Sequence, residues 1–447
     1  MKEDLTQGPV IKTMLRFAVP MIFGNLLQQC YNIADTLIVG RFLGAGALAA
    51  VGSAFSLMTF LTSILLGLAM GSGTVFSIRF GQKDQLGLKE GILASFVLLS
   101  IVTALLNTAV FMGLDWIIWI LRTPANLVAT MREYLSVMFI GLAGIFLFNF
   151  FTSLLRSLGN SVVPLLFLAV SAVLNIALDL WFVAGLNRGA AGAAEATVIS
   201  QYVSGIGIAV YTRIKYPELL RRDKKVRFRL SRVKEITGFS ALTCLQQSIM
   251  NLGILMVQGL VNSFGTTIMA AFAAAVKIDA FAYLPVQDFG NAFSIFTAQN
   301  YGAKQTERIK KGIRAALTAS VAFSLMVSFC VFVFAKPLMT LFINAGETAV
   351  IEEGVRYLHI EGAFYFLIGI LFLFYGLYRA LAKPGMSVVL TIASLGIRVA
   401  LAYALSAIPV FGIAGIWWSV PIGWLLADVL GTVYYFVKRK SLLRGGL

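Results

Sequence analysis

The sequence has 447 residues, of which 59% are hydrophobic and 13% charged, and its mean hydropathy is +0.87. These values exclude a soluble globular protein and predict one whose solvent is the lipid bilayer. The net charge of +16 would suggest a nucleic-acid partner in a soluble protein, so the positions of the charges decide how it is interpreted.

The first half of the chain carries six apolar segments, each long enough to cross a bilayer, for which about 20 residues suffice. They are Thr13–Gly40, Ala47–Ile78, Gly91–Leu114, Thr130–Leu158, Val162–Leu186 and Ala190–Tyr211. Because backbone groups in hydrocarbon must pair within such a continuous apolar run, the segments predict helices rather than a barrel. The first segment lacks the cleavage site of a signal peptide and is expected to be retained.

A basic segment, Lys215–Glu235, follows and is predicted to be a cytoplasmic linker. Six more apolar segments come after it: Thr237–Asn262, Thr267–Ala298, Ile313–Ala335, Val355–Leu381, Ser387–Ile408 and Ile413–Val437. The predicted fold class is therefore an all-α integral membrane protein with twelve transmembrane helices in two pseudo-symmetric six-helix bundles. The predicted domains are residues 1–214, the linker 215–235 and residues 236–447.

The two halves are related by an internal repeat. Identical residues recur in equivalent pairs: Gly44 and Gly265, Phe60 and Phe281, Gly81 and Gly302, Lys83 and Lys304, Arg156 and Arg379, Gly189 and Gly412. Since each half has an even number of spans, the halves keep the same orientation and are expected to be related by an axis along the membrane normal.

The basic residues follow a topological rule. If both termini are cytoplasmic, most of the 36 Lys and Arg lie in segments on the inner side, as the positive-inside rule requires. Nucleic acid is then not an expected partner. We expect a multi-pass protein of the cytoplasmic (plasma) membrane with both termini inside.

Three stretches carry a family pattern: QQCYNIADTLIVGRFLGAGALAAVG at Gln28–Gly52, AAGAAEATVISQ at Ala190–Gln201 and AFAAAVKIDAFAYLP at Ala271–Pro285. They resemble the multidrug and toxin extrusion (MATE) family, and with the repeat the resemblance covers essentially the whole chain. The intramembrane acids Asp35 and Asp179 both lie in the first half, which is similar to the bacterial DinF-like branch.

The resemblance implies a V-shaped antiporter that alternates between outward- and inward-open states and exports amphipathic, often cationic compounds in exchange for H+ or Na+. The expected partners are such small molecules and membrane lipids, the coupling ion takes the place of a cofactor, and a monomer is expected. A second interpretation is a lipid-linked saccharide flippase of similar architecture. A third is a membrane receptor or scaffold that transports nothing.

Asp35 lies well inside the first predicted helix, where a carboxylate costs roughly 2.5–3.5 kcal/mol. Asn175 and Asp179 are four residues apart and so share one face of the fifth helix. The resemblance implies that these three residues and Thr197 form one site for H+ or Na+, and oxygen donors suit such a cation. The alternative is that they only form hydrogen bonds between helices.

Four more first-half residues are candidates for the cavity or for a helix bend: Pro20, Tyr134, Asn149 and Glu195. Pro20 removes a backbone hydrogen bond and permits a bend, either static or coupled to Asp35. Tyr134 and Asn149 match polar cavity positions of relatives. Glu195 departs from the family pattern, and is expected either to be solvated at the outer surface or to add negative charge to the cavity.

The second half has polar residues of its own within apolar segments. They are Lys277, Asp279, Asp288 and Arg398, with Glu361 and Asp428 as further candidates. Interior ion pairs that hold the second bundle together are expected, with substrate binding or gating as the alternative. In the repeat, Arg398 and Ala402 stand opposite Asn175 and Asp179, so ion coupling is expected in the first half alone.

An enzyme is not expected. His359 is the only histidine, which excludes a multi-histidine metal site. The sequence contains neither a nucleophile and base motif nor a phosphate-binding loop. Cys30, Cys244 and Cys330 each lie in an apolar segment and do not suggest a disulfide framework.

Overall fold

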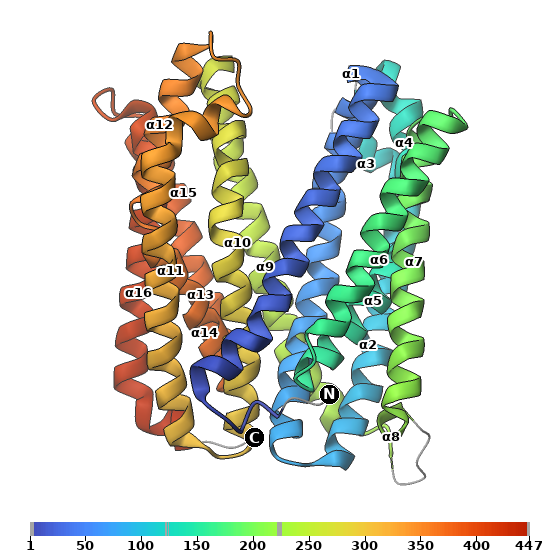
Figure 1. Ribbon diagram of the computed structural model, residues 1–447, viewed down its shortest axis with the longest axis vertical. Helices are drawn as coiled ribbons and strands as arrows, with labels where there is room; N and C mark the ends of the chain where they lie inside the picture. Colours follow the sequence, from blue (N-terminus) through green and yellow to red (C-terminus); the bar gives the residue numbers. More distant parts are fainter. Residues whose placement is uncertain (1–3, 121–122, 124, 221–225, 445–447) are drawn as a thin grey trace. The chain divides into compact units, whose positions relative to one another are not determined.

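The computed structural model describes residues 4–120, 123, 125–220 and 226–444, and every regular element in these ranges is a helix (Figure 1). The helices form two compact units. Unit 1 consists of Met1–Asp4 and Phe23–Cys244, and unit 2 of Leu5–Ile22 and Leu245–Leu447. Residues 221–225 of the predicted linker lie outside the described part of the chain.

Most of α1 (Val10–Gly81) belongs to unit 1. The backbone of this helix departs from helical geometry at Gly44 (φ 82°, ψ −179°). Glycine suits this break because a side chain disfavours positive φ. The break gives two candidate spans, Val10–Gly44 and Gly46–Gly81. The other helices are α2 (Gln85–Met112), α3 (Leu114–Ile120), the 3₁₀ turn Ala125–Leu127, α4 (Val128–Ile140), α5 (Leu142–Ser157), α6 (Val162–Asp179) with the π-helix Leu180–Gly185, α7 (Gly189–Lys215) and α8 (Pro217–Leu220).

Unit 2 is built on the same plan. Its helices are most of α9 (Leu230–Asn262), α10 (Thr266–Gly302), α11 (Thr306–Thr340), α12 (Thr348–Gly362), α13 (Tyr365–Ala380), α14 (Pro384–Thr391) with the π-helix Ile392–Gly396, α15 (Ile397–Ser406) and α16 (Gly412–Arg444). In this unit α10 packs against α11, α12 and α13, and in unit 1 α7 packs against α4, α5 and α6.

The described residues provide 11 helices long and apolar enough to cross a membrane, and a twelfth span where α12 and α13 form one span bent by 52°. The predicted all-α, twelve-span fold is therefore confirmed. The segment predicted as Val355–Leu381 is this bent pair, and the predicted Thr130–Leu158 is α4 followed directly by α5.

Unusual backbone conformations recur at equivalent positions of the repeat. Positive φ angles occur in these pairs: Gly44 (82°) and Gly265 (98°), Lys83 (58°) and Lys304 (57°), Gly159 (83°) and Ala382 (59°), Gly189 (63°) and Gly412 (47°). Lys83 and Lys304 close the same turn between two helices, their N–H groups donating to Phe80 O at 3.0 Å and Tyr301 O at 3.1 Å. The repeat seen in the sequence thus extends to the turns that join the helices.

The two units exchange the beginnings of their first helices. Leu5–Ile22 packs with the second half, and α9 up to Cys244 packs with the first. The second of these contacts is close, because ideal Cβ atoms on Gly67 and Gly71 would lie 2.5 Å from the Cα atoms of Cys244 and Ser240. The two compact units therefore differ from the two domains predicted on either side of the linker only in where these two segments belong.

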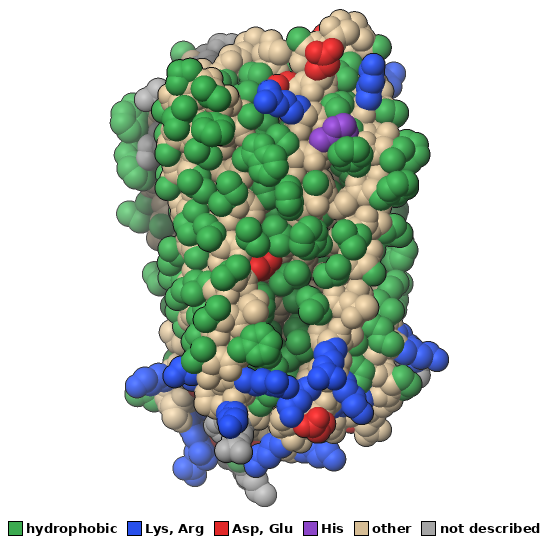
Figure 2. Space-filling model, turned by 90° about the vertical axis from the view of Figure 1, so that its left-hand side faces the viewer, with side chains coloured by type: hydrophobic (Ala, Val, Ile, Leu, Met, Phe, Trp, Pro, Cys, Tyr) green, Lys and Arg blue, Asp and Glu red, His purple; other side chains and the backbone are tan. Residues whose placement is uncertain are grey.

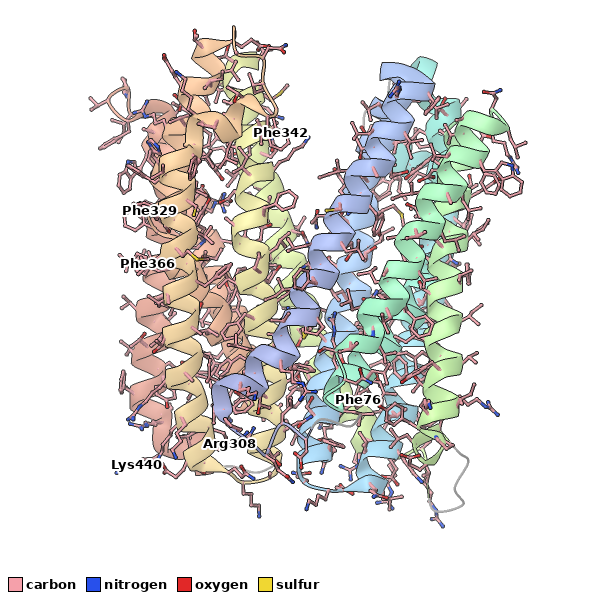
Figure 3. All side chains as sticks on the ribbon, viewed as in Figure 1. Phe76, Arg308, Phe329, Phe342, Phe366 and Lys440 are labelled. Carbon is pink, nitrogen blue, oxygen red and sulfur yellow. The ribbon has the colours of Figure 1, made fainter. Side chains whose placement is uncertain are left out.

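The outer faces of the helices are apolar, as contact with lipid requires. Figure 2 shows hydrophobic side chains over the middle of one face of unit 2, with Lys and Arg gathered toward one end. On α11, Phe329 and Phe332 are 68% and 55% exposed, and Figure 3 labels Phe329 on this outer side.

Candidate functional site

The polar residues predicted to bind a cation meet inside unit 1. Asp35 comes from α1, Asn175 and Asp179 from α6, and Thr197 from α7. Tyr134 of α4 interacts electrostatically with both acids. Asp179, Asn175 and Tyr134 are buried, and the Asp179 side chain is 0% exposed.

The two carboxyl groups are the centre of this cluster. Asp35 and Asp179 interact with each other electrostatically. Asn175 Nδ2 donates to Thr197 Oγ1 at 3.3 Å. Among the described residues, none donates a hydrogen bond to the buried Oδ1 atoms of Asp35 and Asn175 or to either carboxylate oxygen of Asp179.

This geometry has a chemical consequence. Two ionised carboxyl groups so close together repel each other, and removing each from water costs several kcal/mol. The pair is stable when it shares a proton or when a cation lies between its oxygens. The oxygens of Asn175 and Thr197 would add to a donor set of the kind that Na+ accepts.

The helix that carries Asn175 and Asp179 widens directly after Asp179 into the π-helix Leu180–Gly185. Its last turn is closed by Leu186 N–H, which donates to Trp181 O at 2.9 Å. Single π-helical turns occur frequently at functional sites. The sequence analysis did not predict this one.

Tyr31 belongs to the same cluster and was missed by the sequence analysis. It lies one turn before Asp35 on α1 and interacts with it electrostatically. The available signal was the four-residue spacing between a tyrosine and an intramembrane acid, which places both on one helix face.

The other first-half candidates make contacts of their own. Asn149 Nδ2 donates to Ile145 O, one turn back on the same helix, at 2.9 Å. Glu195 forms an ion pair with Arg188 at 2.8 Å, and its side chain is 24% exposed. Pro20 lies in the part of α1 that belongs to unit 2.

A second group of polar residues lies inside unit 2. Asp279 of α10, Glu361 of α12 and Arg398 of α15 interact electrostatically, and both acids are buried. Tyr357 and Tyr365 interact electrostatically with both acids. The sequence analysis missed these tyrosines, although Tyr357, Glu361 and Tyr365 follow one another at four-residue intervals.

The other second-half candidates are placed differently. Lys277 is exposed, and its Nζ lies 5.9 Å from the ring centre of Phe342, which Figure 3 labels. Asp288 is buried on α10, and Asp428 is buried near Tyr375. Of the four residues expected to form a network, Asp279 and Arg398 thus interact, whereas Lys277 is exposed.

Comparison with known proteins agrees with this architecture. A model of the MatE family matches residues 20–181 and 241–404. Probable multidrug resistance protein YpnP of Bacillus subtilis is 30% identical over 449 residues, which cover 99% of this chain and 98% of that protein. Multidrug export protein MepA of Staphylococcus saprophyticus is 25% identical over 454 residues, covering 98% and 96%. A solved outward-facing multidrug resistance MATE transporter superposes with a TM-score of 0.90 at 24% identity, covering 99% of this chain and 98% of that one.

Proposed function

We propose that this chain, which belongs to the MATE family, exports amphipathic, cationic compounds in exchange for H+ or Na+. It is a multidrug exporter and not an enzyme. We place the coupling ion at the unit 1 cluster of Asp35, Asn175, Asp179 and Thr197. The names of the relatives, a multidrug resistance protein and a multidrug export protein, support drug-like substrates.

The observation that carries this proposal is the carboxyl pair. Asp35 and Asp179 interact electrostatically, and Oδ1 of Asp35 and both oxygens of Asp179 are buried without a donor among the described residues. Intramembrane acids are costly and usually functional. A pair that needs a proton or a cation to be stable is suited to binding the ion that drives export.

The direction of coupling follows from linkage. An ion shifts the balance between two conformations only by binding one of them more tightly. We propose that the cluster is loaded from outside and that the loaded cluster favours the outward-facing, drug-releasing shape. Pro20 is proposed to permit the accompanying change in α1, because a proline weakens the backbone ladder of a helix.

We assign Asp279, Glu361 and Arg398 a structural role in unit 2. Asp279 and Glu361 both interact electrostatically with Arg398, so this one basic group offsets part of their negative charge. The unit 1 pair is different because, within the described part of the chain, no basic residue is among the interactions of Asp35 or Asp179.

We place the protein in the cytoplasmic membrane with both termini inside, on the basis of the positive-inside rule. We propose a monomer, and a place in the DinF-like branch because both acids of the cluster lie in the first half.

The test uses purified protein in liposomes, a fluorescent cationic dye, and proton and sodium gradients imposed separately. We expect dye movement with one gradient only, and loss of that movement in Asp35→Asn and Asp179→Asn. Asp115→Asn is the matched control, since this acid of unit 1 has a side chain that is 76% exposed. Dye movement with neither gradient would contradict ion-driven export, and undiminished movement in both Asp variants would contradict the site.

A further inference from the structure

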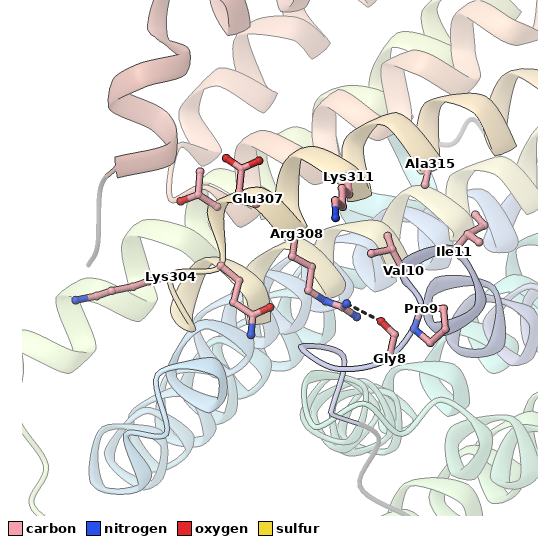
Figure 4. Close-up of a pocket in the computed structure, with 11 residues that line it drawn as sticks. Gly8, Pro9, Val10, Ile11, Lys304, Glu307, Arg308, Lys311 and Ala315 are labelled. Atoms are coloured by element: carbon pink, nitrogen blue, oxygen red, sulfur yellow. Dashed lines mark hydrogen bonds between the residues drawn. The ribbon is translucent and has the colours of Figure 1, made fainter.

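Unit 2 contains a cavity of about 900 Å³ where the N-terminal segment meets the turn between α10 and α11 (Figure 4). This cavity is separate from both groups of intramembrane acids. Its lining has an apolar part, Val10, Ile11 and Ala315, and a basic part, Lys304, Arg308 and Lys311.

The N-terminal segment that forms one side of the cavity is firmly attached to unit 2. Leu5 N–H donates to Gln299 Oε1 at 3.1 Å, and Leu5 is 0% exposed. Arg308 donates through Nη1 to Gly8 O and through Nη2 to Gln7 O, each at 2.6 Å. Figure 4 shows Arg308 pointing toward Gly8, with Lys311 near Val10. The cavity therefore has fixed walls and does not depend on a loose terminus.

At the equivalent place in unit 1, charged side chains form ion pairs with one another. Glu90 of α2 is 1% exposed and lies 3.0 Å from Nε of Arg229 and 3.4 Å from Nε of Arg232. Arg232 also pairs with Glu235 at 3.1 Å, and Arg79 with Glu235 at 2.6 Å. Positive and negative side chains there satisfy one another within the protein.

The repeat assigns each of these positions a counterpart at the unit 2 cavity. Lys83 corresponds to Lys304, and the same alignment places Lys311 at the position of Glu90, Gly8 at that of Arg229 and Ile11 at that of Arg232. The acid is thus replaced by a base, and the two arginines by residues without charge. Among the described residues, unit 2 therefore has a basic cavity where unit 1 has this set of ion pairs.

The cavity keeps a positive balance. Glu307 is the acidic residue in its lining, and it forms an ion pair with Lys310 at 2.6 Å. The field of Lys311 also reaches Glu307, together with that of Arg439. One acid therefore faces several cations, which leaves the cavity complementary to an anion.

We propose that this cavity binds the headgroup phosphate of an anionic phospholipid from the inner leaflet. Basic pockets at the cytoplasmic side of transmembrane helices bind such headgroups. A lipid fits better than a free phosphate because the apolar lining continues along α1. Ile11, Leu15 and Val19, spaced four residues apart, are 39%, 42% and 43% exposed and offer one helix face to an acyl chain.

Native mass spectrometry of the purified full-length protein tests the proposal, with phosphatidylglycerol and phosphatidylcholine added separately. We expect retained phosphatidylglycerol on the wild type, and about fivefold weaker binding in Lys311→Gln, from the loss of one basic group near a phosphate. Lys440→Gln, at an exposed lysine of α16 that does not line the cavity, is the matched control and should bind as the wild type does. Equal retention of both lipids, or unchanged binding in Lys311→Gln, would overturn the proposal.

A second variant introduces into unit 2 the residue types that form the ion pairs of unit 1. Ile11→Arg with Lys311→Glu installs the residue types of Arg232 and Glu90, and is expected to abolish lipid retention while the melting temperature is kept. Wild-type lipid retention in this folded double variant would contradict the site. Soluble glycerol phosphate is added in a parallel titration. If it bound as tightly as the lipid, the ligand would be a free phosphate and not a lipid, which would overturn the proposal.

Discussion

At the scale of single residues, Asp35 and Asp179 differ in their access to water. The Asp179 side chain is fully buried, whereas Asp35 is half-buried. If the pair holds the coupling ion, Asp35, the less buried of the two, is expected to meet solvent before Asp179 does. The two acids are therefore expected to contribute unequally, Asp35 to the rate of ion exchange and Asp179 to the affinity.

Replacing Asp179 by Asn removes a charge at the buried end of the pair. We expect ion-driven dye export to fall at least about tenfold, since a hydrogen bond to a charged group contributes roughly 1.5–3 kcal/mol. Binding of the dye in the absence of a gradient should persist, because the role assigned to Asp179 is ion binding. Export rates in liposomes and dye fluorescence titrations measure the two quantities. Equal loss of binding and export would place Asp179 in the drug pocket instead.

Glu195 gives the opposite expectation. Its ion pair with Arg188 balances its charge, and the Arg188 side chain is 51% exposed. Glu195→Gln should leave export of cationic and neutral compounds in the same ratio as in the wild type, and should change stability by about 0–1 kcal/mol, as exposed ion pairs do. Transport assays with one compound of each charge provide the measurement. A selective loss of cation export would show that Glu195 acts on the cavity.

The sequence predicted the acids of unit 1 more readily than their neighbours. Asp35 and Asp179 stand out because a charge inside an apolar segment is rare and costly. Tyr31 and Tyr357 do not stand out, since tyrosine is common in such segments and its hydroxyl carries no charge. Lys277 was assigned to the same network as Asp279 because a sequence does not state which face of a helix points inward.

At the scale of whole elements, close contact between helices depends on small residues. Gly71 of α1 leaves no room for a side chain, because its ideal Cβ would lie 2.5 Å from Ser240 Cα and 2.6 Å from Phe239 O on α9. Gly67 meets Cys244 in the same way. Glycine here permits the approach of two helices, as small residues do in membrane proteins generally.

Gly71→Ala is therefore expected to destabilise unit 1 by about 1–3 kcal/mol, the usual cost of overpacking. Gly52→Ala in the same helix is the control, since its Cβ would meet nothing within 4 Å. Alanine is the better helix former, so the control should match or exceed the wild type in melting temperature. Thermal unfolding in detergent measures both variants. A Gly71→Ala protein as stable as the control would mean that the helices separate at little cost.

Some features of the elements could not be predicted from the sequence. Hydropathy predicts the transmembrane spans from the length of each apolar segment, but it does not predict whether the helix in that segment is bent. The 52° bend between α12 and α13 was therefore not expected. The π-helix after Asp179 depends on packing and leaves no composition signal. The packing of Leu5–Ile22 with the second half is a long-range contact, which local patterns do not encode.

At the scale of the whole molecule, one helical plan is used twice with different charges. The turns at Lys83 and Lys304 share the same backbone conformation, yet the residues around them have diverged. Unit 1 has the proposed ion site and the ion pairs around Glu90 of α2, whereas unit 2 has acids that interact with Arg398 and a basic cavity. Duplication of the fold has thus left each half free to specialise.

The last prediction concerns the orientation of the chain in the membrane. In unit 2, Figure 3 shows Arg308 and Lys440 toward one end and Phe342 toward the other. The positive-inside rule places the end with Arg308 and Lys440 in the cytoplasm. In a background without Cys30, Cys244 and Cys330, we expect Lys440→Cys to react with a membrane-impermeant maleimide only after cells are opened.

Gly346→Cys, in the exposed loop between α11 and α12, is the matched position at the other end, and nothing lies within 4 Å of its ideal Cβ. It should react in intact cells. The reverse labelling pattern would place both termini outside. Loading of the cluster from outside would then require access through the opposite end of unit 1. Because an ion gradient drives export only when the site opens to its high-concentration side, this orientation decides whether the proposed cycle can run in the export direction.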